Sequence, residues 1–172
     1  MLLARAKPAD LLSYYAWEVV VELGSRDDPQ PVWKKNAWDE AVFVFTYPLM
    51  TGENGIVTWN PVLKRYFLPN YSFLQNNMST PLAWHNKVYD EIANYHHRSQ
   101  ITIFESERPW GPWRLVWRDD DAQRTFGLVV PYTPTFPAKF VQKNGDMWLS
   151  ISGNPGTPGY ALNFAKVGFG GK

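Results

Sequence analysis

Two carboxylates in the stretch "IFESERPWGPWRLVW" are the first residues whose type and spacing could do chemistry. Glycosidases use two carboxyl groups, about 5 to 5.5 Å apart in retaining enzymes and about 6.5 to 9.5 Å apart in inverting ones. Because side chains alternate along a strand, Glu105 and Glu107 share a face if the strand continues that far. We expect either a candidate catalytic pair or a solvated turn with Arg108 or Arg114 as partner.

Aromatic rings crowd the same stretch. Pro109 and Pro112 bracket Gly111, and Trp110 and Trp113 flank it. The indoles are candidate substrate-binding residues, because a flat ring can receive one face of a sugar. In the alternative the prolines fix φ, the glycine allows a tight turn, and the rings pack a corner between sheets. We favour the packed corner.

A long segment supplies two further candidates. Residues 80–100, "TPLAWHNKVYDEIANYHHRSQ", form a longer connection than a hairpin needs. Long ordered insertions often carry function, so Trp84 and His85 are candidate substrate-binding residues.

Metal and cofactor signals are weak. The acidic run from Asp119 to Asp121 offers the oxygen ligands that calcium prefers, but its spacing matches no defined loop. A structural calcium ion and a solvated connection are therefore both open. No HExxH pair is present, and the absence of cysteine excludes disulfides, thiol nucleophiles and cysteine-ligated metals. We expect no other metal and no cofactor.

The composition indicates a globular chain rich in aromatic rings. Of its 172 residues, 45% are hydrophobic and 16% are Phe, Trp or Tyr. The formal net charge of +1 gives no electrostatic reason to expect a nucleic acid or an anionic membrane as partner. The start "MLLARAKPAD" is charged too early for a signal peptide. We expect either an intracellular protein or a missing N-terminus.

Alternating runs rich in β-branched and aromatic residues predict an almost entirely β protein. Asn144-Gly145 is a strong hairpin-turn signal, because both residues tolerate positive φ. Helices are expected only over 8–15 and 86–96. The predicted strands are 17–23, 41–45, 55–61, 65–73, 100–106, 113–117, 138–142, 147–152 and 160–169.

Two layouts alternate along the chain. Residues 17–35 and 101–117 each read as strand, charged turn with proline, tryptophan and short strand. Residues 54–68 and 136–152 each read as strand, polar turn and a strand carrying an aromatic residue. This order is typical of β-propeller blades, in which an inner hairpin precedes an outer one.

We therefore predict an all-β fold with four-stranded antiparallel blades. A single partial propeller domain of about 2.5 to 3 blades would fill the chain. It would hold the outer half of one blade over 1–40, a complete blade with an insertion over 41–118, and a last blade over 119–172. Such a fragment exposes sheet edges and an apolar face, so it should form a homo-oligomer that completes the ring or pair with missing blades.

Several stretches resemble consecutive landmarks of one secreted bacterial and fungal family, domain of unknown function 4185. They are "LLARAKPADLLSYYAWEVV", "TWNPVLKRYFLPNYSF", "ITIFESERPWGPWRLVW", "FPAKFVQKNGDMWLSISGN" and "YALNFAKV". That family is similar to the five-bladed propellers of glycoside hydrolase family 43 and to the sialidases, and some members are reported to be endo-D-arabinanases. The resemblance implies a secreted propeller that binds polysaccharide over its central channel. It covers only the later part of the family domain, whose early blades tend to carry the key carboxylates.

Three more polar residues would lie near such a channel. Asp39 precedes the predicted strand 41–45 and is a candidate for catalysis or binding, with a surface turn as the alternative. Asn60 and Lys139 lie on the predicted inner hairpins and could bind sugar hydroxyls. Their alternative is pairing with a turn carbonyl or a carboxylate.

Three functional hypotheses follow. The first is a fragment of a glycoside hydrolase-type domain that acts on a cell-wall polysaccharide such as an arabinan. The second is a carbohydrate-binding propeller without catalysis. The third is a half propeller that assembles with copies of itself.

Overall fold

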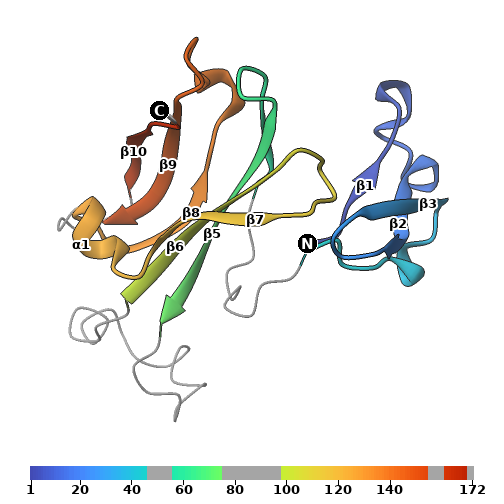
Figure 1. Ribbon diagram of the computed structural model, residues 1–172, viewed down its shortest axis with the longest axis horizontal. Coiled ribbons are helices and arrows are strands. Elements are labelled where there is room, and N and C mark those ends of the chain that lie inside the picture. Colours follow the sequence, from blue (N-terminus) through green and yellow to red (C-terminus); the bar gives the residue numbers. More distant parts are fainter. Residues whose placement is uncertain (46–55, 75–97, 155–160, 170–172) are drawn as a thin grey trace.

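The protein is built almost entirely of β-strands (Figure 1). The computed structural model describes residues 1–45, 56–74, 98–154 and 161–169. The strands in these ranges form three separate antiparallel sheets, which we call A, B and C, and none of the three closes into a barrel. The prediction of an all-β fold is confirmed.

Sheet A contains the N-terminal strands in the order β1–β2–β3. They span Ala4–Arg5, Glu18–Gly24 and Pro29–Lys35. The predicted strand over 17–23 is confirmed, and Val19 and Val20 are its buried residues. The predicted helix over 8–15 is wrong. Two single-turn 3₁₀ helices, η1 (Pro8–Asp10) and η2 (Tyr14–Ala16), occupy that region in place of one α-helix.

Sheet B has four strands that follow one another both in the chain and in the sheet. They are β4 (Thr58–Asn60), β5 (Arg65–Leu74), β6 (Arg98–Ser106) and β7 (Arg114–Asp119). Both predicted strand pairs in this part of the chain are confirmed.

Sheet C contains β8 (Val129–Thr135), β9 (Met147–Asn154) and β10 (Ala161–Val167), with β9 in the centre. The predicted strands over 147–152 and 160–169 are confirmed. The sequence "VVPYTPT" of β8 was not predicted as a strand, because proline cannot donate to a sheet ladder. An edge strand tolerates proline, and β8 lies at an edge.

Two predicted strands are wrong. Residues 41–45 form no ladder and make only separate backbone hydrogen bonds: Val42 N–H donates to Val20 O at 2.9 Å, and Val44 N–H donates to Met1 O at 3.0 Å. Residues 138–142 begin instead with a 3₁₀ turn, η5 (Ala138–Phe140).

The main core lies between sheets B and C, which pack face to face. Alternate side chains of β5, β6 and β9 point into it. Leu128 and Phe136, which flank β8, and Ala122 of helix α1 (Ala122–Phe126) complete it. Burial of a large apolar side chain stabilises a fold by about 1.5 to 3 kcal/mol, so this interface is the main source of stability in this part of the chain. Its buried members are Phe67, Ile101, Ile103, Ala122, Leu128, Phe136, Met147, Leu149 and Ile151.

Candidate functional site

One end of sheet B brings several predicted site residues close together. The strand register pairs Asn60 with Arg65, and the next residue, Tyr66, with Ser106. Glu105 and Glu107 therefore lie at the same end of the sheet as the β4–β5 turn. We call Arg65, Glu105, Glu107 and Arg114 the charged end of sheet B.

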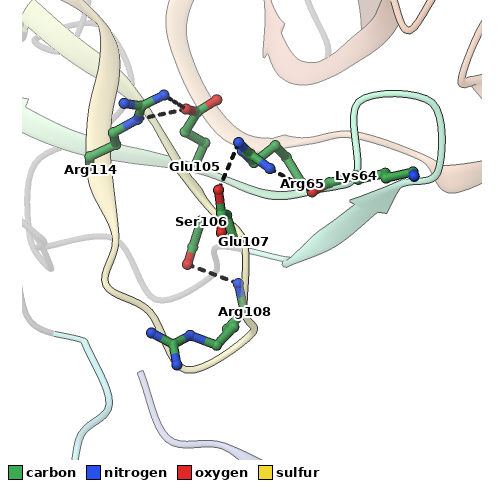
Figure 2. Close-up of polar contacts among 7 residues, drawn as sticks. All are labelled: Lys64, Arg65, Glu105, Ser106, Glu107, Arg108 and Arg114. Carbon is green, nitrogen blue, oxygen red and sulfur yellow. Dashed lines mark hydrogen bonds and ion pairs between the residues drawn. The ribbon is translucent and has the colours of Figure 1, made fainter. Parts of the chain in front are cut away.

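Each carboxylate at the charged end has its own arginine (Figure 2). The guanidinium of Arg114 donates two hydrogen bonds to one oxygen of Glu105, the one from Nε at 2.6 Å. Nη2 of Arg65 lies 2.9 Å from an oxygen of Glu107. The side chain of Glu105 is 13% exposed and that of Glu107 is 73% exposed. The two carboxylates thus occupy different environments.

The expected sharing of one strand face does not occur, because β6 ends at Ser106 and leaves Glu107 in the following turn. The alternative that Arg114 partners Glu105 is confirmed. The partner of Glu107 is Arg65, from the neighbouring strand, and not Arg108.

Arg108 instead connects this turn to sheet A. Its backbone N–H donates to Ser106 Oγ at 3.2 Å, and its Nη2 donates to Asp28 at 3.0 Å. Hydrogen bonds from Arg108 and then from Gln30 hold the pKa of Asp28 below its usual value. The turn that follows the charged end is therefore held by both sheets.

Trp110 and Trp113 pack a corner between sheets. The ring of Trp110 lies edge to face with that of Trp33 of β3, with centroids 6.4 Å apart, and Trp113 lies 6.0 Å from Phe45. Gly111 has φ +103°, and a Cβ there would lie 3.1 Å from the backbone nitrogen of Trp113, so the turn requires glycine. This geometry matches the packed-corner alternative.

Asn60 is fully buried and bridges two turns. Its Nδ2 donates to Gly145 O at 2.7 Å, and its Oδ1 accepts from the backbone N–H groups of Val62 and Leu63, both at 3.1 Å. The alternative of pairing with a turn carbonyl is confirmed.

The remaining candidates lie elsewhere. Lys139 is exposed on η5, with Nζ 4.8 Å from the ring centroid of Phe140. Asp39 is exposed on η3 (Trp38–Glu40), which follows β3 in the chain, and not on sheet B. Trp84, His85 and the predicted helix over 86–96 lie outside the described residues.

Protein donors bind the acidic run Asp119 to Asp121 at the end of β7. Asp120 accepts from Nε of Arg118 at 2.6 Å and from Nε2 of Gln100 at 2.6 Å. The hydrogen bond from Arg118 is the largest cause of the lowered pKa of Asp120. Asp119 accepts from the backbone N–H of Asp121 at 2.8 Å. Within the described ranges, no three His, Cys, Asp or Glu residues converge as metal ligands.

Trp59, the exposed member of an aromatic pair beside the charged end, is not identified by the sequence analysis. Trp59 of β4 pairs with Tyr66 of β5 across the ladder, and their ring centroids lie 4.6 Å apart with a 48° tilt. Trp59 is 40% exposed. Alternation was the available signal, because Trp59 must face away from the core if its neighbour Asn60 is buried.

Comparisons with known proteins add no family. A scan of protein-family models and a search of curated proteins found no match to this chain. The family resemblance therefore stays a prediction that depends on the quoted motifs. In the described part of the chain, no helix combines the length and the hydropathy needed to cross a bilayer.

Proposed function

We propose that this chain is part of a carbohydrate-active β-propeller and binds a glycan at the Trp59–Tyr66 pair. Sheets A, B and C would be consecutive blades. Two features support this arrangement: sheet B keeps its four strands in chain order, and its core face packs against that of the following sheet. The family resemblance supports the choice of ligand.

The observation that carries the proposal is the exposed indole of Trp59 at the end of sheet B where the charged residues lie. A sugar ring has an apolar C–H face that an aromatic ring can cover and hydroxyl groups that need hydrogen-bond partners. Tyr66 supports the indole from the neighbouring strand. Arg65 precedes Tyr66 in the chain, and its ion-pair partner Glu107 offers an exposed carboxylate to hydroxyl groups at the same end of the sheet.

Binding suits this site better than cleavage. A glycosidase uses two carboxyl groups that flank the same bond of the substrate. Glu105 lies in β6 and Glu107 in the turn that follows it, and each carboxylate is engaged by its own arginine. Hydrolysis, which the resemblance implies, would therefore need carboxyl groups other than this pair.

Binding to a panel of soluble polysaccharides, including arabinan and xylan, tests the proposal. We expect Trp59→Ala to weaken the association constant for the bound polysaccharide roughly tenfold or more in titration calorimetry, as expected for an aromatic anchor. Trp117→Ala is the matched control, because Trp117 is 37% exposed on β7 at the opposite edge of sheet B.

The outcomes distinguish glycan binding at Trp59 from hydrolysis by Glu105 or Glu107. Equal affinity of wild type and Trp59→Ala, or no binding to any polysaccharide, contradicts the proposed site. A reducing-sugar assay on the same samples detects cleavage. Release of sugar that Glu105→Gln or Glu107→Gln abolishes would replace binding by hydrolysis as the function.

A further inference from the structure

Sheet C exposes apolar side chains on the side that does not pack on sheet B. Met147, Leu149 and Ile151 of β9 point into the core shared with sheet B, so the alternate positions face outward. On the edge strand β10, Leu162 is 62% exposed and Phe164 is 47% exposed. We call Leu162, Phe164, Phe140 and Trp148 the C-face. Phe140 lies edge to face with Phe164 at 5.8 Å, and Trp148 shares the outward side in register.

A second apolar surface lies beside sheet A. Leu11, Leu12, Tyr14 and Tyr15 form it, and we call them the N-patch. Leu12 is fully exposed and Tyr15 is 70% exposed. Tyr14 stacks on Trp38 at 5.6 Å with an 18° interplanar angle, and it meets Tyr15 edge to face at 5.5 Å. The aromatic part of this surface is therefore ordered before any partner binds.

The two surfaces belong to segments of opposite charge. Residues 1–45 contain five Lys or Arg and seven Asp or Glu, a side-chain charge of −2. Residues 129–169 contain three Lys and one Asp, a side-chain charge of +2. Lys139 lies at the C-face next to Phe140, while Asp10 lies next to Leu11 at the N-patch. Both surfaces are therefore apolar, and the segments that carry them are opposite in net charge.

The two surfaces lie toward opposite ends of the long axis, with β10 on the left and sheet A on the right (Figure 1). Contact between unlike surfaces on two copies is heterologous, and it produces either a closed ring or an open chain. A contact between two C-faces would instead place like charges together. The observed charges therefore favour contact between unlike surfaces.

We propose that a second copy of this chain docks head to tail, with its N-patch on the C-face of the first. Contact of apolar surfaces removes both from water, and opposite charges orient the encounter. This inference concerns assembly and does not use the Trp59–Tyr66 pair.

Complementation between two variants tests the contact. The C-face variant carries Leu162→Asp and Phe164→Asp, and the N-patch variant carries Leu12→Asp and Tyr15→Asp. All four positions are exposed, so circular dichroism should give wild-type spectra for both variants. In light scattering, wild type should exceed the monomer mass of 19.9 kDa at high concentration, and each variant alone should not. We expect each variant to weaken self-association roughly 30-fold or more.

An equimolar mixture gives the decisive result. One intact C-face and one intact N-patch remain in the mixture, so a complex of two chains of 19.9 kDa each should form. Val116→Asp on exposed β7 is the control and should associate like wild type. A monomeric wild type at about 100 µM, association that survives in either variant, or a mixture that stays monomeric overturns the proposal. Glycan titrations with Trp59→Ala test the proposed glycan site independently of this assembly.

Discussion

Asn60→Ala should weaken the junction between sheets B and C without changing any charge. The buried side chain donates to Gly145 O at 2.7 Å and accepts from Val62 N and Leu63 N at 3.1 Å each. Gly145 is itself buried, so water cannot readily replace the lost donor. Val62 is exposed and its N–H can bind water.

These contacts set the expected magnitude. A typical hydrogen bond contributes about 1 kcal/mol net, and a buried acceptor left without a donor costs about 1 to 3 kcal/mol. Asn60→Ala should therefore lower the free energy of unfolding by about 2 to 4 kcal/mol. That loss is a large part of the roughly 5 to 15 kcal/mol that stabilises an ordinary domain.

Urea denaturation followed by tryptophan fluorescence measures the loss. Lys143→Ala is the control, because Lys143 is exposed on the turn that contains Gly145 and should change the free energy by less than about 0.5 kcal/mol. A loss below about 1 kcal/mol for Asn60→Ala, with an unchanged denaturant slope, refutes the bridging role. Folded Asn60→Ala should keep wild-type glycan affinity. A binding defect with normal stability would return Asn60 to the ligand site.

Three further predictions concern the same sheets. Gly145→Ala should lower the thermal midpoint more than Gly127→Ala, although both glycines have positive φ. A Cβ at Gly145 would lie 2.8 Å from Cδ2 of Leu63, whereas a Cβ at Gly127 would have no atom within 4 Å. Thr58→Val should cost about 1 to 2 kcal/mol in urea denaturation, because it loses a 2.5 Å hydrogen bond to the backbone carbonyl of Phe136. Thr102→Val should be neutral or stabilising, because that buried hydroxyl has no hydrogen-bond partner among the described residues. The hydrogen bond from Lys166 lowers the pKa of the Asp146 carboxyl below its ordinary value of 3.8. The stability that this ionised carboxylate adds to the fold is therefore present above pH 3.8 and is lost as the pH falls through the lowered pKa of the folded state. The difference in thermal midpoint between wild type and Asp146→Asn should therefore shrink below that pH and stay constant near neutrality.

Strands with clear alternation were predictable from the sequence. The runs that became β5, β6 and β9 place apolar side chains on one face, and burial of that face selects the strand. Residues 41–45 have the same local pattern but form only isolated hydrogen bonds with Val20 and Met1. A β-strand needs a partner strand to hydrogen-bond along its length, and the local alternation of apolar residues does not show whether such a partner is present. The prolines of β8 had the opposite effect and concealed an edge strand.

The partners at the charged end depend on register, which the sequence does not display. A bulge between Ile103 and Phe104 brings Arg114 opposite Glu105. Without that shift, the strand pattern alone would place a different residue of β7 there. Glu107 lies beyond the end of β6, and its arginine comes from β5, more than 30 residues earlier in the chain. Composition and spacing identify such carboxylates as candidates but cannot assign their partners.

In this chain, the polar type of a residue was therefore a poor guide to whether its side chain is free to bind a ligand. Folding requires partners for buried polar groups, so a side chain such as Asn60 is by default occupied within the protein. Recruiting it for a ligand would break the bond to Gly145 O at a cost to stability. An exposed ring has no such prior commitment, because covering Trp59 removes apolar surface from water and breaks no internal hydrogen bond. This asymmetry is why the proposed glycan site is centred on Trp59, and it makes that ring the residue whose removal should separate binding from folding.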